Sequence, residues 1–339
     1  MENVVDQKIE QPQLSKQARH NIRMRKLENY KGWLFLLPAL VFLAIFTFYP
    51  IINSVFAAFR NGYAMSKYGI FSDYKFSIFG TEDLVYDSLW GIENFKSAVT
   101  DSYFVNALAN TFIIAVITVP GSLILALLIA VALNSIKGFQ KFYQTVLFLP
   151  YLTNALAIGS VFMVMFQTQV IGSVTSYGLI DTLFHITTEW TSTKASYAAM
   201  RTVIITYGIW SGLPFKILIL IGALQSVSKQ YYDAAKIDGA NKFTILRKIT
   251  IPLISPMLTY LFITGLIGGF KVYTSIVGIF GAQMGPNNDY EMVTIVGLIY
   301  KYLEDGQLGV ASAASLILFA IIFVITEINT HFIKKRVYY

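Results

Sequence analysis

Two lysines, Lys216 and Lys271, interrupt long runs of apolar residues. A charged side chain at the centre of a bilayer costs at least ~2.5 kcal/mol on insertion scales, so each lysine should face a cavity or an opposite charge. Because no acidic residue of the chain lies at matching depth, three interpretations stay open. An acid on another subunit pairs with one lysine, Lys216 extends its ammonium toward the cytoplasm, or Lys271 lines an aqueous path and donates hydrogen bonds to a ligand.

Aromatic residues accompany both lysines. Tyr207 and Trp210 share one face of a helix in the run that contains the first lysine, while Phe270 and Tyr273 flank the second. Aromatic rings combined with a few polar groups are typical of pockets that bind small molecules. Ordinary packing between helices is the alternative role for these four side chains.

The composition indicates what kind of element holds these residues. The chain has 339 residues, of which 55% are hydrophobic and 13% are charged, and its mean hydropathy is +0.58. A soluble domain carries about 25% charged residues, so the sequence predicts an integral membrane protein. Six runs reach the length of ~20 residues that a spanning helix needs. They cover residues 33–59, 104–134, 142–166, 198–227, 257–280 and 308–333.

The fold class follows from the length of these runs. Backbone groups in hydrocarbon must be paired within the segment, which favours α-helices, and the short alternating pattern of a β-barrel is absent from the sequence. The sequence therefore predicts an all-α protein with six transmembrane helices. We expect a basic N-terminal segment at residues 1–30, partly disordered because it is polar, and a transmembrane domain at residues 31–339.

Basic residues gather in four segments that alternate with the predicted helices. By the positive-inside rule these segments lie in the cytoplasm, which places both termini there. The net charge of +7 then reflects topology and attraction to anionic lipid, and not binding to nucleic acid. The basic residues are Lys8, Lys16, Arg19, Arg23, Arg25, Lys26, Lys31, Lys137, Lys141, Lys229, Lys236, Lys242, Arg247, Lys248, Lys334, Lys335 and Arg336.

The link between the fourth and fifth predicted helices contains the stretch "YYDAAKIDGANKFTILRKITIPLISP" at residues 231–256. Ser228 or Ser226 can cap the start of a short helix, and Gly239 can end it in a left-handed conformation. Asn241 can then cap a second short helix. The sequence predicts two short helices on the cytoplasmic face.

Pro252 should end the second short helix, because proline disfavours the α-helical conformation of the residue before it. Both helices are then too short to span a bilayer. Small residues would let another protein approach closely, and apolar residues would anchor it in a groove. An amphipathic helix lying among lipid headgroups is the alternative. The small residues are Ala234, Ala235 and Ala240, and the apolar ones are Tyr231, Tyr232, Ile237 and Phe243.

This stretch resembles the cytoplasmic signature of binding-protein-dependent ABC transporter permeases. That signature reads Glu-Ala-Ala, two residues, Asp-Gly-Ala, a spaced Ile and two prolines four apart. Asp233 replaces the usual Glu and Leu246 replaces a usual Phe, so an ion pair between Asp233 and a partner would be arranged differently. The matching residues are Asp233, Ala234, Ala235, Asp238, Gly239, Ala240, Ile249, Pro252 and Pro256.

The resemblance implies that the loop 228–256 couples this chain to a separate ATPase subunit. The residues implied in coupling are Tyr232, Asp233, Ala234, Ala235, Asp238, Gly239, Ala240 and Pro252. It also implies a multi-pass protein of the bacterial cell membrane that works with two ATPase subunits, a second homologous permease and an extracytoplasmic solute-binding protein.

Further segments narrow the resemblance to carbohydrate-uptake permeases, such as those for maltodextrins, glycerol phosphate and oligosaccharides. The similar segments cover residues 33–55, 91–112, 146–156 and 308–319. This implies that the chain forms half of a translocation path for a sugar or oligosaccharide. Helices four and five contribute to the path in that family. The candidate path residues are Tyr207, Trp210, Lys216, Phe270, Lys271 and Tyr273.

Motifs for catalysis or cofactor binding are absent from the sequence. No Gly-Lys pair occurs, so the chain holds no P-loop, and ATP with its Mg²⁺ should bind the partner ATPase. We therefore expect no enzyme activity, no catalytic residue and no cofactor in this chain. The absence of cysteine and the wide separation of the three histidines also predict no metal site.

A secondary transporter and an ABC permease for a non-sugar solute are the alternative functions. Secondary transporters commonly place titratable carboxylates near the middle of the membrane. Glu327, near the end of the sixth run, is the only acidic residue in the predicted helices. This absence favours a path that is driven from outside the membrane.

Overall fold

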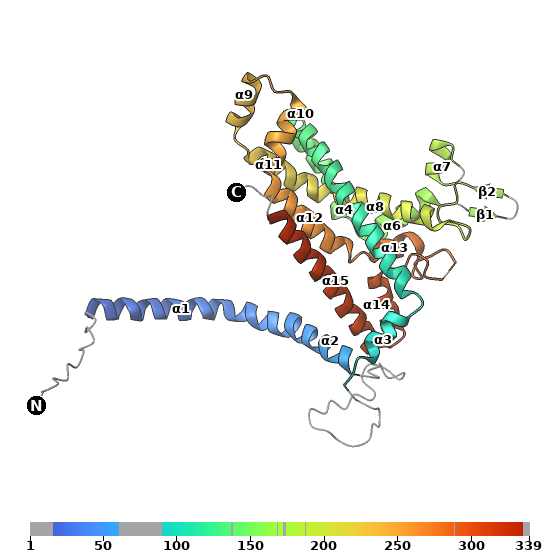
Figure 1. Cartoon of the computed structure of the whole chain (residues 1–339), viewed down its shortest axis with the longest axis horizontal. Helices are drawn as coiled ribbons and strands as arrows, with labels where there is room; N and C mark the ends of the chain where they lie inside the picture. The colour runs from blue at the N-terminus through green and yellow to red at the C-terminus, as the bar shows by residue number, and fades with distance from the viewer. Residues whose placement is uncertain are drawn as a thin grey trace, which may run out of the picture. The chain divides into compact units, whose positions relative to one another are not determined.

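The computed structural model describes residues 16–60, 90–136, 138–167, 169–171, 174–186, 188–287 and 289–334. The chain forms two compact units, Met1–Phe56 and Ala57–Tyr339. The first unit contains helix α1 (Lys16–Leu43), a π-helical turn η1 (Ala44–Phe48) and the start of α2 (Tyr49–Phe59) (Figure 1). The helical stretch Tyr30–Phe59 is long and apolar enough to span a membrane, in agreement with the predicted first helix. Its last three residues belong to the second unit.

The described part of the N-terminal segment belongs to α1. Residues 16–30 are helical, because good helix formers such as Lys, Arg, Gln and Leu fill this stretch and neither Gly nor Pro interrupts it. Partial disorder of the segment 1–30 stays a prediction. For residues 1–15 it lies outside the described residues, and the domain boundary at residue 30 stays a prediction.

Three long helices form the frame of the second unit. They are α4 (Phe104–Ser135), α8 (Tyr197–Ser226) and α15 (Leu308–Lys334), and each contains a segment long and apolar enough to span a membrane. Their bounds agree with the predicted runs to within about one residue, as expected for uninterrupted apolar segments. Small groups let α4 and α8 approach closely, since a Cβ atom on Gly208 would lie 2.7 Å from the Thr118 side chain and one on Gly212 would lie 3.3 Å from that of Ser122.

The predicted third helix, residues 142–166, is wrong as one continuous element. The chain forms α5 (Gln140–Phe148), a 3₁₀ turn η2 (Leu149–Leu152) and α6 (Ala155–Phe166), with a bend of 96°. Asn154 starts α6, because its side chain accepts a hydrogen bond from the backbone N–H of Leu156 (2.8 Å). Thr153 and Asn154 favour this local capping over a continued helix.

The predicted fifth helix, residues 257–280, is also interrupted. Helix α12 (Ser255–Gly269) ends at a Gly-Gly pair, and four residues separate it from α13 (Thr274–Phe280). Glycine is a poor helix former, so a break after Gly268 and Gly269 has little energetic cost. Helix α12 is preceded by a shorter helical segment, and the two are bent by 71°.

Helix α13 crosses α6 at two glycines. A Cβ atom built on Gly159 would lie 2.9 Å from the Cα atom of Gly278, and one built on Gly278 would lie 3.0 Å from the Cα atom of Gly159. Any side chain at either position would separate the backbones. The crossing therefore depends on both glycines and holds the start of α13 against α6.

The remaining elements are short. The described residues include one small antiparallel sheet, β1 (Gln169–Ile171) with β2 (Val174–Ser176), which is the exception to the all-α prediction. The short helices are α3 (Glu93–Thr100), α7 (Leu179–Phe184), α9 (Lys229–Ile237), α10 (Lys242–Ile245), α11 (Ile251–Leu253) and α14 (Ile295–Glu304). Within the second unit, α9 and α10 lie at one end of the long helices, and α3 and α14 lie at the other (Figure 1).

The number of membrane crossings depends on how the bent helices are counted. The described residues contain four helices that are long and apolar enough to span a membrane. The number rises to six if the bent pairs 140–152 with 155–166 and 242–253 with 255–269 each count as one crossing. The structure is thus a nearly all-helical bundle with four to six candidate spans.

Candidate functional site

The loop between α8 and α12, residues 228–256, is called the docking segment below. Its first helix, α9, begins after Ser228, whose hydroxyl accepts a hydrogen bond from the N–H of Gln230 (3.4 Å). Gly239 ends it with φ of +72°, and the carboxamide oxygen of Asn241 accepts a hydrogen bond from the N–H of Thr244 (2.7 Å). These three local predictions are confirmed, because caps and left-handed glycines depend on nearby residues alone.

The predicted end of the second helix before Pro252 is wrong. Helix α10 continues through a π-helical turn η3 (Leu246–Thr250) into α11, and the chain leaves the helical path only at Ile254. In a π-helical turn the N–H of Ile251 bonds to the carbonyl of Leu246, five residues earlier. This wider turn relieves the steric conflict that a proline ring has with a regular α-helical turn.

The outer surface of the docking segment carries apolar side chains that no described residue covers. Ile237 is 86% exposed, Phe243 is 68% exposed and Tyr231 is 55% exposed. Ala235 is buried, and the Tyr232 hydroxyl lies 3.5 Å from that of Thr250, so one side of α9 is held against the rest of the segment. The free side is an apolar surface that no other part of the described chain covers.

The eight residues implied in coupling lie together at this end of the molecule. Six of them belong to α9 and the turn that follows, with Asp233, Ala234, Asp238 and Gly239 exposed and Tyr232 half-buried. Ala235 is buried, and Ala240 and Pro252 are half-buried. Asp233 pairs with Lys236 on its own helix at 3.4 Å, an exposed contact that contributes little to stability. The carboxylate of Asp233 therefore stays accessible to another subunit.

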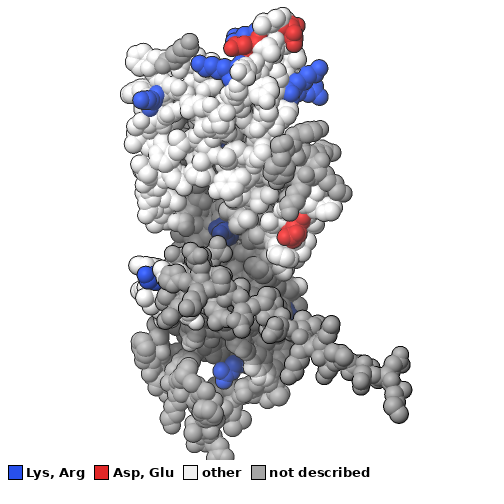
Figure 2. All heavy atoms as spheres, turned by 90° about the vertical axis from the view of Figure 1, so that its left-hand side faces the viewer, with Lys and Arg blue, Asp and Glu red and all other residues white. Residues whose placement is uncertain are grey.

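Charged residues gather at the same end. On the face shown in Figure 2, Lys, Arg, Asp and Glu side chains cluster at the top of the molecule, and the described surface below them carries few charges. Exposed Lys229, Lys236, Lys242, Arg247 and Lys248 belong to the docking segment. A charged cap on an apolar bundle is expected where the chain leaves the membrane and meets water or a soluble subunit.

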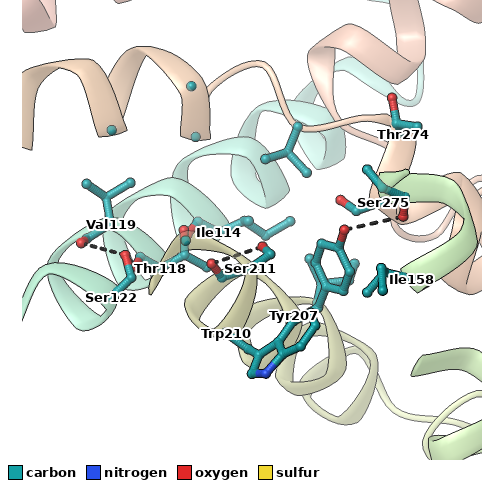
Figure 3. A pocket seen from close by; sticks show the side chains of 18 of the residues that line it. Ile114, Thr118, Val119, Ser122, Ile158, Tyr207, Trp210, Ser211, Thr274 and Ser275 are labelled. Atoms are coloured by element: carbon teal, nitrogen blue, oxygen red, sulfur yellow. Dashed lines mark hydrogen bonds between the residues drawn. The ribbon is translucent and has the colours of Figure 1, made fainter. Parts of the chain in front are cut away.

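A pocket of about 410 Å³ lies between α4, α6, α8 and the break between α12 and α13. Five of the six predicted path residues line this pocket, and Figure 3 shows two of them, Tyr207 and Trp210, on neighbouring turns of α8. Neutral polar side chains complete the wall, including Thr118, Ser122 and Ser211. The five predicted residues are Tyr207, Trp210, Lys216, Lys271 and Tyr273.

Lys216 is buried in the wall of the pocket, with 8% of its surface exposed. Its ammonium donates a hydrogen bond to the Ser122 hydroxyl on α4 at 2.6 Å, and that hydroxyl donates in turn to the carbonyl of Thr118 at 2.6 Å. A Cβ atom on Gly212 would lie 3.0 Å from the ammonium nitrogen, so glycine there leaves room for it. The lysine is therefore held between α4 and α8 by a neutral partner.

Lys271 lies in the break between α12 and α13, which corrects the prediction that it sits near the middle of a helix. The Gly-Gly pair before it ends α12, and its side chain is exposed. Tyr273 follows at the start of α13, where its ring stacks on that of Tyr300 with centroids 4.2 Å apart and planes 8° apart. The break thus presents a lysine and an aromatic pair beside the pocket.

Tyr207, Trp210 and Phe270 make different contacts. The Tyr207 hydroxyl donates to the carbonyl of Ala155 at 3.3 Å, and both Tyr207 and Trp210 contact the ring of Phe162. Phe270 does not line the pocket, because it is 2% exposed and packs edge-on against Phe112. Packing is therefore the role that the geometry gives to Phe270.

Sequence reasoning missed the residues that position Lys216. Ser122 and Thr118 belong to a stripe of small residues on α4, and Gly212 and Gly265 lie on the two facing helices. The stripe has helical spacing, and a small polar residue within it was the available signal for a polar contact between helices. The stripe consists of Ala107, Thr111, Ala115, Thr118, Ser122, Ala126 and Ala130.

A second polar cluster was also missed, at the other end of α4. The amide nitrogen of Asn110 donates to the carbonyls of Glu291 and Val293, both at 3.0 Å, and its oxygen accepts from Nε of Arg201 at 3.1 Å. This cluster fixes the loop before α14 to α4 and α8. Close by, a hydrogen bond to Asp289 raises the pKa of Tyr103. An asparagine inside an apolar run was the sequence signal for it.

The part of the chain that the structure describes contains no group of three or more His, Asp and Glu side chains that could hold a metal ion. The pocket offers hydroxyls, aromatic rings and ammonium groups, which can hold a polar molecule by hydrogen bonds and stacking. Its chemistry suits binding and release of a solute.

Comparisons with known proteins agree with this picture. Residues 97–338 match the family model described as "Binding-protein-dependent transport system inner membrane component". The chain is 30% identical over 315 residues to MG188 of Mycoplasma genitalium, named as a probable ABC transporter permease protein, covering 89% of this chain and 86% of that protein. It is 28% identical to the multiple sugar-binding transport system permease protein MsmF of Streptococcus mutans, covering 91% of this chain and 97% of that protein.

A solved structure has the same fold. It is a bacterial ABC transporter involved in the import of the acidic polysaccharide alginate, with a TM-score of 0.72 and 19% sequence identity. The match covers 93% of this chain and 99% of that chain. At this identity the likeness shows the fold alone.

Proposed function

The chain belongs to the family of binding-protein-dependent transport system inner membrane components, and we propose that it transports a sugar or oligosaccharide by coupling to a separate ATPase through the docking segment. As a member of this family it is a multi-pass component of the bacterial cell membrane and a translocation subunit of an ABC importer. The observation that carries the coupling proposal is the exposed apolar surface of α9 and α10 at one end of the bundle.

The docking proposal rests on the shape and chemistry of that surface. Exposed Ile237 and Phe243 can enter a groove on a partner, while exposed Ala234 on α9 lets the partner's backbone come close. Capping by Ser228 and Asn241 makes the two helices rigid, so that a movement of the partner is transmitted to α8 and α12. Lipid headgroups would also accept an amphipathic helix, and the docking test below distinguishes the two.

The remaining partners follow from the same proposal. Two ATPase subunits hold ATP and Mg²⁺, a second permease completes the path, and an extracytoplasmic binding protein delivers the solute. The proposed topology has six crossings and both termini in the cytoplasm, so that the docking segment would lie on the ATPase side. A solved neighbour is an alginate ABC transporter in complex with an alginate pentasaccharide-bound periplasmic protein, which supports this arrangement of partners.

A carbohydrate is the proposed solute. Relatives include a multiple sugar-binding system permease and a lactose transport system permease, the latter 26% identical over 92% of this chain. The pocket supports this choice, because Tyr207, Trp210 and Tyr273 offer rings to sugar C–H faces and hydroxyl side chains lie between them. A permease for a non-sugar solute is the alternative.

The experiment is uptake by proteoliposomes that contain the assembled importer and its binding protein. The proposal predicts sugar accumulation that requires ATP on the ATPase side and stops when the ATPase subunits are omitted. Accumulation that instead follows a proton or sodium gradient without ATP would contradict it and would favour a secondary transporter.

A further inference from the structure

Two ammonium groups and no carboxylate belong to the wall of the pocket. Lys216 and Lys271 line it, and none of its described lining residues is Asp or Glu. We propose that the solute handled by this pocket is anionic: a carbohydrate or polyol that carries a carboxylate or a phosphate. This inference rests on the proposed transport function and names the charge of the substrate.

Lys216 has donors to spare. An ammonium carries three N–H groups, and among the described residues Ser122 accepts one of them while no salt bridge involves this lysine. Gly212 makes space for the ammonium, since a Cβ atom there would lie 3.0 Å from its nitrogen. The surroundings accommodate the ammonium without neutralising its charge.

Lys271 adds a second charge on a wall made of backbone. Gly265, Gly268 and Gly269 line the pocket beside it, and a Cβ atom on Gly268 would meet nothing within 4 Å. The backbone N–H of Lys271 bonds to the carbonyl of Gly268 at 3.0 Å, which fixes where the side chain starts. Its exposed ammonium has no ion pair among the described residues.

The neutral groups of the pocket already meet the needs of a neutral sugar. Hydroxyls from Thr118, Ser122 and Ser211 and the tyrosine rings supply hydrogen bonds and stacking without any charge. An unpaired ammonium in a site of low dielectric is unfavourable, and an anion removes that penalty by pairing with it. Walls of low dielectric also focus the field of two like charges onto a solute of opposite charge.

The test measures binding of small probes to the assembled importer in nanodiscs. Nucleotide and the solute-binding protein are left out, so that only the pocket determines which probe binds. The probes are trigalacturonate for a carboxylate, glycerol 3-phosphate for a phosphate, and maltotriose as the neutral sugar. We expect one anion to bind about tenfold or more tightly than maltotriose, with a preference that weakens as salt rises to ~1 M. The two anions distinguish a uronic acid from a phosphate ester as the source of the charge.

Variants connect the preference to the lysines. Lys271→Gln should lower the ratio of anion to maltotriose affinity by about tenfold, and Lys271→Arg should retain it. Lys216→Gln should lower the ratio as well, and if that variant does not assemble the two Lys271 variants decide. Lys96→Gln is the control. Lys96 is an exposed lysine on α3 that pairs with Glu93, so this substitution removes the same charge at a position that does not line the pocket.

Three results would overturn the inference. They are equal affinity for maltotriose and the anions, an unchanged ratio in Lys271→Gln, and no binding of any probe at millimolar concentration. The second result would assign the lysines to an acid of the second permease. The proposed function is measured separately, by ATP-dependent uptake and ATPase docking, so either can fail while the other stands.

Discussion

Lys216 on α8 and Ser122 on α4 are joined by a hydrogen bond of 2.6 Å across the most extensive helix-helix contact among the described residues. The lysine is buried, and the serine hydroxyl is the described group that accepts a hydrogen bond from its ammonium. This contact connects the wall of the pocket to the packing of the bundle, because the same hydroxyl also bonds to the carbonyl of Thr118.

Replacing Ser122 by Ala should destabilise the protein. The substitution leaves a buried ammonium without its acceptor, which costs about 1–3 kcal/mol. The midpoint of thermal unfolding of the importer in detergent should fall. Ser211→Ala is the matched control, since that hydroxyl lines the pocket but makes a weaker bond of 3.4 Å within its own helix. Equal midpoints for the two variants would show that the contact has no structural role.

The crossing of α6 and α13 should tolerate no added methyl group. Gly159→Ala places a Cβ atom 2.9 Å from the Cα atom of Gly278, so the helices must separate, at a cost of about 1–3 kcal/mol. Gly222→Ala on α8 is the control, because a Cβ atom there meets nothing within 4 Å. Thermal unfolding should show a loss of stability for the first variant alone. A normal unfolding midpoint for Gly159→Ala would contradict the crossing.

Asn94 should hold the end of α2. Its amide nitrogen donates to the carbonyls of Ala58 at 3.0 Å and Arg60 at 2.8 Å, and the residue is 6% exposed. Asn94→Asp replaces this donor by an acceptor, so we expect a loss of about 1–3 kcal/mol and faster proteolysis near residue 60. Asn106→Asp, at a half-exposed position that bonds to Glu291, serves for comparison. Unchanged proteolysis in Asn94→Asp would refute this role.

Much of the bundle could be predicted from the sequence. The long helices α4, α8 and α15 follow from uninterrupted apolar runs, and the caps Ser228 and Asn241 and the turn at Gly239 follow from their immediate neighbours. These features depend on local residues and on the length needed to cross a bilayer.

The breaks in the helices could not be predicted in the same way. Each run keeps a high overall hydropathy despite the polar residues at the bend near Thr153 and at the break near Lys271, so hydropathy alone predicts one continuous helix in each. The contacts of Lys216 with Ser122 and of Tyr273 with Tyr300 join residues far apart in sequence. Only tertiary packing decides such pairs, and it is also what gathers five of the six predicted path residues around one pocket.

Docking of the ATPase should depend on α9. Ala234→Arg places a large charged side chain on the exposed face, and Gly239→Pro cannot adopt the observed φ of +72°. Both variants should insert into the membrane and retain about tenfold less ATPase during purification. Ala234→Ser preserves the small size and should retain the ATPase normally. Normal retention by both disruptive variants would assign α9 to the lipid surface.

The most direct test of the central claim uses the absence of cysteine in the natural chain. A single cysteine at Ile237, which is 86% exposed on α9, would carry a photoactivatable crosslinker in the assembled importer. A single cysteine at Thr182, exposed on α7, is the control on the side predicted to face away from the cytoplasm. We predict a crosslink to the ATPase subunit from Ile237→Cys and none from Thr182→Cys. A crosslink to lipid alone from position 237, or to the ATPase from position 182, would contradict coupling through the docking segment.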